Sequence, residues 1–378
     1  MTPPLSELPG RPLRIGIDGR ELEGRPTGVG RYVRSLLRRF ATNDRHQFTV
    51  YTATSVSLPS PSARIEARVL PGGHPTLWEQ RTLPAAARKD RIDVLLSPAY
   101  SCPLLTSIPR VTAIHDLSFF ARTEEFGFAH GLRRRLMARW SARVSRNVLA
   151  FSEFTKREIR DRLGVSASDR TRVVLHGPDD DLPESPDRGE SRAALGLAEG
   201  TEYVITVGTV LTRRNVSILV RAVALLRSHG RAVRLGVVGE NRSRPFQDLA
   251  ALARSLGCEA AIHLSGFVTD EEVVRHYAAA DVAVFLSEYE GFGLPALEAM
   301  SRGVPTIVAD RGSLNELFAP GGLVVEPNEA AVTSALRSVL NDPELSADLR
   351  KRGTERAGDF SWERSARQTL TILEEAAS

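Results

Sequence analysis

The sequence predicts an α/β protein made of two doubly wound domains, and three observations lead to that prediction. The chain has 378 residues, which exceeds the ~100–200 residues that one domain usually holds. Short β-rich apolar runs alternate with longer amphipathic runs, as in parallel sheets covered by helices on both faces. One acidic, proline-rich stretch at 177–190 interrupts this alternation and indicates a linker between two domains.

Residues 1–176 are expected to form the N-terminal domain. Its predicted strands are 13–18, 48–53, 93–98, 110–116 and 147–152. Helical patterns lie between them. One example is 30–40, where the apolar residues Tyr32, Val33, Leu36, Leu37 and Phe40 recur at helical spacing. The change in composition after this half places the linker at 177–195.

The alternation restarts in a C-terminal domain at 196–355. The predicted strands there are 203–208, 234–239, 262–267, 282–287, 304–309 and 322–327. The predicted helices are 215–229, 245–257, 270–280, 294–302 and 328–340. This is a complete doubly wound domain by itself, and the segment 356–378 is expected to add one more helix after it.

Composition narrows the function classes. Hydrophobic residues make up 42% of the chain and charged residues 25%, which is typical of a globular protein. No apolar run reaches the ~18–20 residues that cross a bilayer, and residues 1–14 lack the apolar stretch of a signal peptide. Cys102 and Cys258 fall in different predicted domains, which argues against a disulfide framework. We therefore expect a cytoplasmic protein.

The charge balance does not indicate a nucleic-acid partner. The formal net charge is only +4, and all but three of the 50 basic residues are arginine. Such a bias reflects genome composition more readily than function.

The loop TGVGRYV at 27–33 follows the first strand and opens a helix, where amide groups and the helix dipole favour an anion. It does not fit the dinucleotide fingerprint, because Val33 stands where a third glycine is needed and 52–54 offers no acidic residue. The loop around Gly28 and Gly30 is therefore either a tight turn or a site for another anion.

His115 and Asp116 end an apolar strand, at the edge of the sheet where ligands of open α/β folds bind. A single histidine is often structural. An imidazole at a strand's carboxyl end can also hydrogen-bond a substrate or transfer a proton, and this position favours that interpretation.

Arg213 and Arg214 follow a glycine turn after the first strand of the second domain. Two guanidinium groups on one loop can bind a diphosphate and offset charge that develops on it as a leaving group. In a chain so rich in arginine, an ordinary solvated basic pair explains them equally well. The neighbouring motifs must decide between a diphosphate site and a solvated basic pair.

That context is the segment 287–310. Glu290 precedes the turn Gly291–Gly293, whose missing side chains allow a ligand close to the backbone, and Leu294-Pro295 then opens a helix. Glu298 lies one turn into that helix. Two carboxylates beside an anion-binding helix start can accept hydrogen bonds from hydroxyl groups next to a phosphate. A sugar nucleotide presents such groups, and this interpretation is favoured over two surface glutamates beside a turn.

The stretch EGFGLPALE, with seven residues between Glu290 and Glu298, resembles the E-x7-E motif of retaining family-four glycosyltransferases of GT-B fold. Further motifs match in order over nearly the whole chain: TGVGRY at 27–32, HDLSFF at 115–120, SEFTKREI at 152–159, VGTVLTRRN at 207–215, SGFVTDEEV at 265–273, RGSLNEL at 311–317 and FSW at 360–362. Departures occur at Arg214, where lysine is usual, and at 176–178.

The resemblance implies two Rossmann-like domains that face each other across a cleft, with the acceptor on the N-terminal domain and the donor on the C-terminal one. The final helix, 356–378, would cross back to the N-terminal domain. Glu298 would bind the ribose, Glu290 would lie beside the donor sugar, and the base would meet the backbone at 266–268. The catalytic candidates are His115, Arg213, Arg214 and Glu290. The donor-binding candidates are Gly28, Gly30, Gly208, Phe267, Val268, Phe292, Gly293, Leu294 and Glu298.

The implied reaction moves a hexose from a nucleoside-diphosphate sugar to a hydroxyl of a glycan or lipid-linked acceptor, with retention and without a metal or other cofactor. The likeness of HDLSFF to mannosyltransferase-like members favours GDP-mannose over UDP-glucose or another UDP-sugar. A nucleotide-sugar epimerase and a non-catalytic binder remain as rivals. The presence of both glutamates and both arginines argues against a non-catalytic binding protein.

The run Asp179–Asp181 resembles the paired aspartates that hold a divalent cation in glycosyltransferases of a different fold. It lies in the predicted linker, however, and Arg213 and Arg214 already supply positive charge. We therefore expect no metal site.

The segment 131–147 combines arginines with large apolar residues on one predicted helix. The arginines are Arg133, Arg135, Arg139, Arg143 and Arg146, and the apolar residues are Leu132, Leu136, Trp140 and Val144. Such a helix can lie on an anionic membrane surface, for example at the inner face of the membrane, where lipid-linked acceptors reside. It can equally pack its apolar stripe on its own domain. The sequence leaves both alternatives open.

Overall fold

The computed structural model describes residues 11–25, 27–60 and 62–378. They form two compact units. Of the described residues, those in 11–123, 127–177 and 361–378 form the first unit, and those in 124–126 and 178–360 form the second. Residues 1–10, where we expect no signal peptide, lie outside the described part. Within the described part, no helix is both long and apolar enough to cross a membrane.

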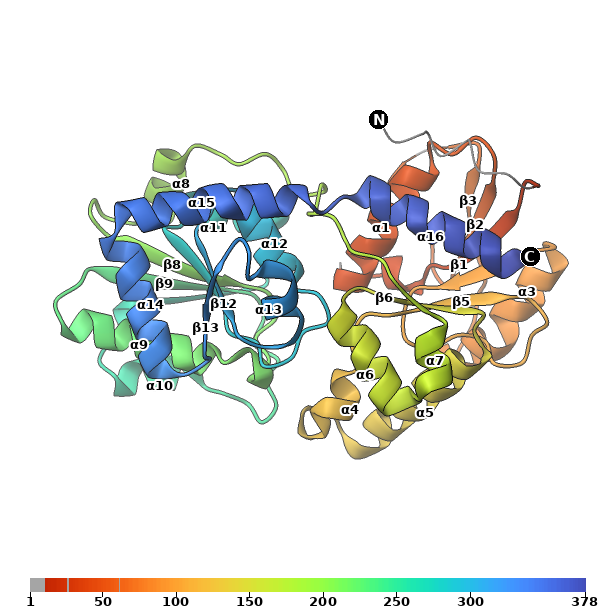
Figure 1. Ribbon diagram of the computed structural model, residues 1–378, viewed down its shortest axis with the longest axis horizontal. Helices are drawn as coiled ribbons and strands as arrows, with labels where there is room; N and C mark the ends of the chain where they lie inside the picture. The colour runs from red at the N-terminus through yellow and green to blue at the C-terminus, as the bar shows by residue number, and fades with distance from the viewer. Residues whose placement is uncertain (1–10, 26, 61) are drawn as a thin grey trace. The chain divides into compact units, whose positions relative to one another are not determined.

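The first unit is built on a parallel sheet with the strand order β3-β2-β1-β4-β5-β6-β7. Figure 1 shows its strands β1, β2, β3, β5 and β6. Its strands are β1 Arg14–Asp18, β2 Gln47–Thr52, β3 Ile65–Val69, β4 Val94–Ser97, β5 Arg110–Ile114, β6 Asn147–Ala150 and β7 Thr171–Val173. Its helices are α1 Gly28–Phe40, α2 Pro75–Leu77, α3 Leu83–Lys89, α4 Ser118–Ala121, α5 Phe128–Val144, α6 Glu153–Leu163, α7 Val165–Asp169 and α16 Trp362–Ala377. Shorter helical turns are η2 Arg20–Leu22 and η3 Trp78–Thr82, whereas η4 Thr123–Glu125 begins in the first unit and continues into the segment 124–126 of the second.

Helix α1 follows from its sequence. The Thr27 side chain caps it by accepting a hydrogen bond from the amide of Gly30 at 2.9 Å. The apolar residues predicted to share one face are all buried: Tyr32, Val33, Leu36, Leu37 and Phe40. This face packs against α16, which also packs on β4 and β5. The last helix is therefore an integral part of the first unit.

The second unit is a parallel sheet in the order β10-β9-β8-β11-β12-β13. Its strands are β8 Glu202–Val207, β9 Val233–Val238, β10 Ile262–Gly266, β11 Val282–Phe285, β12 Thr306–Ala309 and β13 Leu323–Val325. Its helices are α8 Arg188–Ala194, α9 Val216–Ser228, α10 Leu249–Ser255, α11 Asp270–Ala279, α12 Leu294–Ser301, α13 Gly312–Phe318, α14 Glu329–Asn341 and α15 Pro343–Gly358, with the turns η5 Thr212–Arg214 and η6 Glu259–Ala261.

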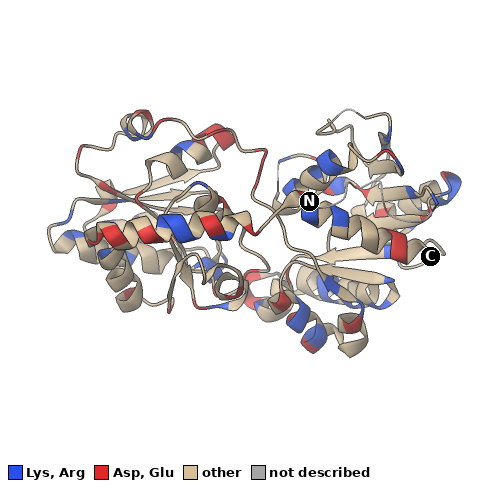
Figure 2. Ribbon diagram, turned by 45° about the horizontal axis from the view of Figure 1, so that its top comes forward, with Lys and Arg blue, Asp and Glu red and all other residues tan. Residues whose placement is uncertain are grey.

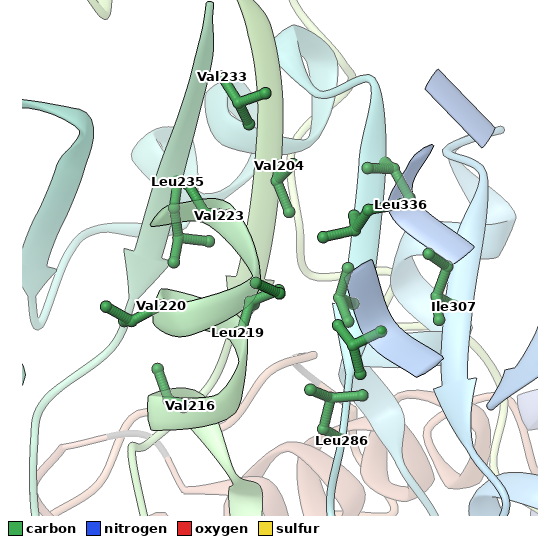
Figure 3. Close-up of a cluster of buried hydrophobic side chains, with 14 of the residues drawn as sticks. Val204, Val216, Leu219, Val220, Val223, Val233, Leu235, Leu286, Ile307 and Leu336 are labelled. Atoms are coloured by element: carbon green, nitrogen blue, oxygen red, sulfur yellow. The ribbon is translucent and has the colours of Figure 1, made fainter. Parts of the chain in front are cut away.

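Helices cover both faces of this sheet. On one face, Val216, Leu219, Val220 and Val223 of α9 pack toward Val204 of β8 and the side chains of β9 (Figure 3). Leu336 of α14 joins the same core. The central strand β11 is buried along its whole length, which explains its continuous apolar run. The predicted doubly wound architecture is confirmed in each unit.

The structure differs from the predicted elements at several places. Strands β3 and β7 and helices α13 and α15 were not predicted. The predicted linker at 177–195 contains α8, which packs on α11, so all of it beyond Gly177 belongs to the second unit. The final helix begins at Trp362, because residues 356–358 are still part of α15.

Candidate functional site

The second sheet has a topological switch point between β8 and β11. These neighbouring strands continue into helices on opposite sides, and open α/β folds bind ligands in the crevice outside the carboxyl ends of such strands. The loop after β8 carries Gly208, Arg213 and Arg214, and the loop after β11 carries Glu290. The topology therefore brings together residues that are about 80 positions apart in the sequence.

Arg214 and Glu290 form an ion pair at this switch point. The Nε of Arg214 donates to Oε1 of Glu290 at 2.9 Å, and the Ser287 hydroxyl donates to the same oxygen at 2.9 Å. Both side chains are largely shielded from solvent. Within the described part of the chain, no acceptor is recorded for the two terminal nitrogens of Arg214. Its guanidinium therefore has donors left for an anionic ligand.

Gly208 makes room for Arg214. Its φ is +115°, a conformation that residues with side chains rarely adopt, and an added Cβ would collide with Nη1 of Arg214. The position of Arg214 therefore requires glycine at 208, and the predicted contact of Gly208 with the donor stays a prediction. Beneath the pair lies a cavity of about 20 Å³, lined in part by Ser287, Gly293 and Leu314, which is room for about one water molecule.

Helix α12 begins directly beside Glu290. Gly293 has a φ of +108° and precedes the first helical residue, Leu294, while Pro295 occupies the first turn. The first amide groups of a helix have no partner within the helix, and with the helix dipole they favour an anion. The Phe292 side chain packs edge-on against Phe318, so only its backbone is suited to ligand contact.

Glu298 lies on α12 and is only 5% exposed. Its Oε2 accepts a hydrogen bond from the hydroxyl of Tyr277 at 3.1 Å, and the same hydroxyl is 3.2 Å from the carbonyl oxygen of Pro295. Tyr277 is itself buried. Tyr277 therefore fixes the orientation of the carboxylate. The sequence analysis missed this residue, because it lies on α11 and no nearby motif marks it.

Arg213 is held by a second carboxylate. Its Nη1 donates to Oε2 of Glu125 at 2.6 Å, its backbone amide donates to Oε1 at 3.1 Å, and its Nε donates to the carbonyl oxygen of Tyr289 at 3.2 Å. Glu125 lies in the short segment 124–126 that belongs to the second unit. Both members of the pair are nearly buried. The sequence analysis missed Glu125, since 88 positions separate it from Arg213.

The backbone predicted to meet a base ends β10 at the same edge of the sheet. Gly266 has a φ of +67°, and Phe267 after it is 57% exposed. Val268 is half-buried. An exposed aromatic ring at a strand's carboxyl end can stack on a planar ligand.

In the first unit, Gly28 and Gly30 open α1. Gly28 is exposed, whereas Gly30 is buried, and a Cβ on Gly30 would approach the carbonyl oxygen of Glu21 to 2.5 Å. Gly30 is therefore required by the packing of η2 on α1. Gly28 remains available to a ligand at the helix start.

His115 belongs to an aromatic cluster at the carboxyl edge of the first sheet. Its ring lies 4.3 Å from that of Phe151, and the Phe151 ring lies 4.1 Å from that of His176. Tyr32 is 5.1 Å from His115, and Trp362 is 5.1 Å from His176. The cluster joins residues that follow β5, β6 and β7 to α1 and α16. At the departure from the family pattern at 176–178, the imidazole of His176 stacks on Phe151.

Burial lowers the pKa of His115 to about 4, although the carbonyl of Pro98 and the charge of Asp116 act in the opposite direction. The imidazole is therefore neutral near pH 7. Its Nε2 lies 2.9 Å from the carbonyl oxygen of Pro98, which requires the proton to be on Nε2. Nδ1 is then the nitrogen that can accept a hydrogen bond from a hydroxyl group.

The carboxylates of Asp179, Asp180 and Asp181 lie within 4.8 Å of one another. Asp179 accepts a hydrogen bond from the backbone amide of Asp181 at 2.9 Å, as in a local turn. Along the chain, this run lies between β7 and α8, so it is not on the loops of the switch point. Asp179 thus helps to close this turn.

Comparisons with known proteins agree with this architecture. A family model described as glycosyl transferases group 1 matches residues 187–356, and one described as Glycosyltransferase Family 4 matches residues 26–182. The O-antigen chain mannosyltransferase B of Escherichia coli is 30% identical over 261 residues, which cover 69% of this chain and 68% of that protein. A D-inositol 3-phosphate glycosyltransferase of Kineococcus radiotolerans is 29% identical over 292 residues, covering 70% and 66%.

Among solved structures, sucrose-phosphate synthase from Thermosynechococcus elongatus has a TM-score of 0.79 at 20% identity and covers 97% of this chain and 99% of that one. This likeness concerns the fold. The chain spans from about half to about two thirds of the length of the curated relatives it matches. The two family models together cover both halves of the sequence, and the fold agrees with them. The chain therefore belongs to the family-four, group-one glycosyltransferases of GT-B fold.

Proposed function

We propose that this chain is a retaining hexosyltransferase that transfers a hexose from a nucleoside-diphosphate sugar to an acceptor hydroxyl. The observation that carries the proposal is the Arg214–Glu290 pair beside the start of α12. It sets a cation with unused donors and a carboxylate next to an anion-binding helix terminus. That arrangement suits a diphosphate and the sugar attached to it.

In the proposed reaction, the bond between the anomeric carbon and the diphosphate oxygen breaks while the acceptor oxygen bonds to the same face of that carbon. The acceptor proton passes to an oxygen of the departing diphosphate, so no protein nucleophile is needed. Arg214, Arg213 and the amides at the start of α12 offset the charge on the leaving group. Glu290 stabilises the positive character of the sugar ring. With these cations, no metal is required.

We assign the donor to the C-terminal unit and the acceptor to the N-terminal unit, where His115 can orient a hydroxyl through Nδ1. Glu298 binds the ribose, and Phe267 and Val268 adjoin the base. The acceptor is a glycan or a lipid-linked sugar. A cytoplasmic location fits two buried cysteines that form no disulfide.

GDP-mannose is the favoured donor, because the E. coli relative is a mannosyltransferase. UDP-glucose or another UDP-sugar is the alternative, since other relatives are D-inositol 3-phosphate glycosyltransferases. A nucleotide-sugar epimerase would use the same donor site without an acceptor.

Thermal unfolding with GDP-mannose, UDP-glucose, UDP-galactose and UDP-N-acetylglucosamine tests the proposal, because a ligand of the native state raises the melting temperature by mass action. One donor should stabilise the wild type and have little effect on Glu298→Ala. Mass spectrometry and NMR of the product then report the transfer and the anomeric configuration. Stabilisation by none of the donors, or an epimerised donor formed without acceptor, would overturn the assignment.

A further inference from the structure

Helix α5 exposes its large apolar side chains to solvent. Phe128, Leu132, Leu136 and Trp140 are 82%, 41%, 46% and 53% exposed. They recur at every fourth position, so they form one slowly winding stripe along the helix. The helix packs on its unit through small residues instead: Gly131, Ala138, Ser141 and Ala142. Of the apolar residues predicted to share this helix, Leu132, Leu136 and Trp140 are thus exposed and only Val144 is half-buried, so most of the predicted stripe does not pack on its own domain.

The same helix carries positive charge only. Residues 128–146 contain six arginines and no acidic residue. In the described part of the protein, Arg133, Arg139 and Arg143 are exposed and form no ion pair. Helix α15 of the second unit shows the ordinary arrangement, in which charges of both signs alternate (Figure 2) and Arg352 pairs with Asp348. α5 itself carries no acidic residue that could offset the charge of Arg133, Arg139 and Arg143.

We propose that the exposed face of α5 docks onto an anionic lipid bilayer. The helix would lie parallel to the surface, with Phe128, Leu132, Leu136 and Trp140 at the boundary between headgroups and acyl chains. The arginines would contact lipid phosphates, because their long stems can lie on apolar surface while the guanidinium reaches the headgroups. An indole at this depth is also well placed, with its ring in the apolar layer and its N–H near water.

Other occupants fit this face less well. A nucleic acid would match the charge but not four exposed apolar side chains. A second copy of the chain would bring two sets of unneutralised arginines together, and like charges across an interface are costly. A lipid surface satisfies both the charge and the apolar stripe. The inference does not depend on the identity of the donor, and its test needs neither donor nor acceptor.

Trp140 offers a direct test. The chain has three tryptophans, and the other two, Trp78 and Trp362, are 2% and 3% exposed. Vesicles of phosphatidylglycerol and phosphatidylcholine should shift the fluorescence of the full chain to shorter wavelength at low salt. Vesicles of phosphatidylcholine alone should shift it far less. Trp140→Phe should still sediment with the anionic vesicles but show no shift.

Two pairs of variants separate charge from apolar contact. Arg133→Gln/Arg139→Gln/Arg143→Gln should weaken binding to the anionic vesicles by about 10²-fold, since each arginine near such a surface contributes about one kcal/mol. The control Arg221→Gln/Arg337→Gln/Lys351→Gln removes the same charge from exposed positions of the second unit and should have little effect. Leu132→Ser/Leu136→Ser should also weaken binding. Its control is Leu256→Ser/Leu264→Ser, where the two leucines are 37% and 42% exposed.

Several results would overturn the proposal. One is the absence of binding to anionic vesicles at low salt. Another is an equal loss in each variant and its control. Binding to a DNA oligomer as tight as to vesicles, and unchanged in Leu132→Ser/Leu136→Ser, would identify a site for polyanions. A concentration-dependent dimer that this leucine variant dissociates would identify a second copy as the partner.

Discussion

The Nε of Arg214 donates to Oε1 of Glu290 at 2.9 Å, although 76 positions separate the two residues in the sequence. The contact exists because β8 and β11 are adjacent at the switch point of the second sheet. It joins the residue proposed to hold the diphosphate to the residue proposed to lie beside the sugar. The two side chains should therefore act together in turnover.

Glu290→Gln should lower kcat by about 10²-fold while leaving the affinity for the free nucleoside diphosphate nearly unchanged. The amide keeps the shape but loses the charge that stabilises the sugar ring in the transition state. Steady-state kinetics and calorimetry of the same samples measure both quantities. A large loss of affinity for the free nucleotide would show that Glu290 does not face the sugar.

The coupling of the pair can be measured with a double-mutant cycle of Glu290→Gln and Arg214→Ala. Residues in contact usually show interaction energies of about 0.5–3 kcal/mol. Glu202→Gln with Arg231→Ala is the matched cycle, because this ion pair lies at the start of β8, away from the switch point. Its variants should leave kcat unchanged.

Glu298→Ala should weaken the binding of the free nucleoside diphosphate by ~1.5–3 kcal/mol, because hydrogen bonds from the ribose to a charged acceptor are lost. Tyr277→Phe should weaken it by about 0.5–1.5 kcal/mol, since the carboxylate loses the hydroxyl that orients it. Calorimetry measures both changes.

Tyr203→Phe is the control for Tyr277→Phe. Tyr203 is equally buried in the second unit, but its hydroxyl bonds to Nδ1 of His276 at 2.6 Å. Glu344→Ala, at an exposed position, is the control for Glu298→Ala. If Tyr203→Phe weakened nucleotide binding as much as Tyr277→Phe, the effect would be general loosening of the unit.

The elements of the second unit were largely predictable, because strands β8, β9, β11 and β12 are mostly buried and appear as apolar runs. Strand β3 was not, since Glu66 and Arg68 on this edge strand are not buried and interrupt any apolar run. Strand β7 and helix α13 are too short to show a period.

Glu290 and Glu298 could be selected as candidates from the sequence because a local motif marks them, and their roles stay predictions. Tyr277 and Glu125 could not, because each reaches its partner through the fold from a distant segment. The exposure of Leu132, Leu136 and Trp140 also required the structure. Spacing places these residues on one face of a helix, but only the packing of Gly131 and Ala138 shows that this face is outside.

Turnover should survive chelation with EDTA. Arg213, Arg214 and the start of α12 carry the positive charge that a cation would otherwise supply to the leaving group. Initial rates with and without chelator, followed by added magnesium or manganese, measure this. Asp180→Asn/Asp181→Asn should likewise retain activity. A complete loss in EDTA that magnesium or manganese restores would contradict the proposal.

The first unit should lose stability as the pH falls from about 6.5 to about 4. His115 has a lowered pKa in the folded state, so the unfolded chain binds a proton in this range that the folded chain does not. The stabilisation is present above the unfolded pKa and declines by up to about 1.4 kcal/mol per pH unit for one proton. Burial lowers the pKa of His176 as well and adds to the effect.

Tryptophan fluorescence during urea unfolding reports this unit alone, because Trp78, Trp140 and Trp362 all belong to it. His115→Gln should flatten the dependence on pH, while His229→Gln, at an exposed position of the second unit, should not. An identical pH dependence in wild type and His115→Gln would mean that the pKa of His115 is the same in the folded and unfolded states.

Gly208→Ala should reduce both stability and affinity for the free nucleoside diphosphate. The backbone φ of +115° strains any side chain, and the new Cβ would push the guanidinium of Arg214 away from Glu290. Gly257→Ala is the matched control, since Gly257 has a φ of +65° and open space around its Cα. Each substitution should destabilise the second unit by about 1–3 kcal/mol through strain. Only Gly208→Ala should also weaken nucleotide binding, by about tenfold or more, as expected when a charged hydrogen bond to phosphate is lost. Calorimetry on folded samples of both variants separates the two effects, and equal affinities in the two variants would show that Arg214 does not hold the diphosphate.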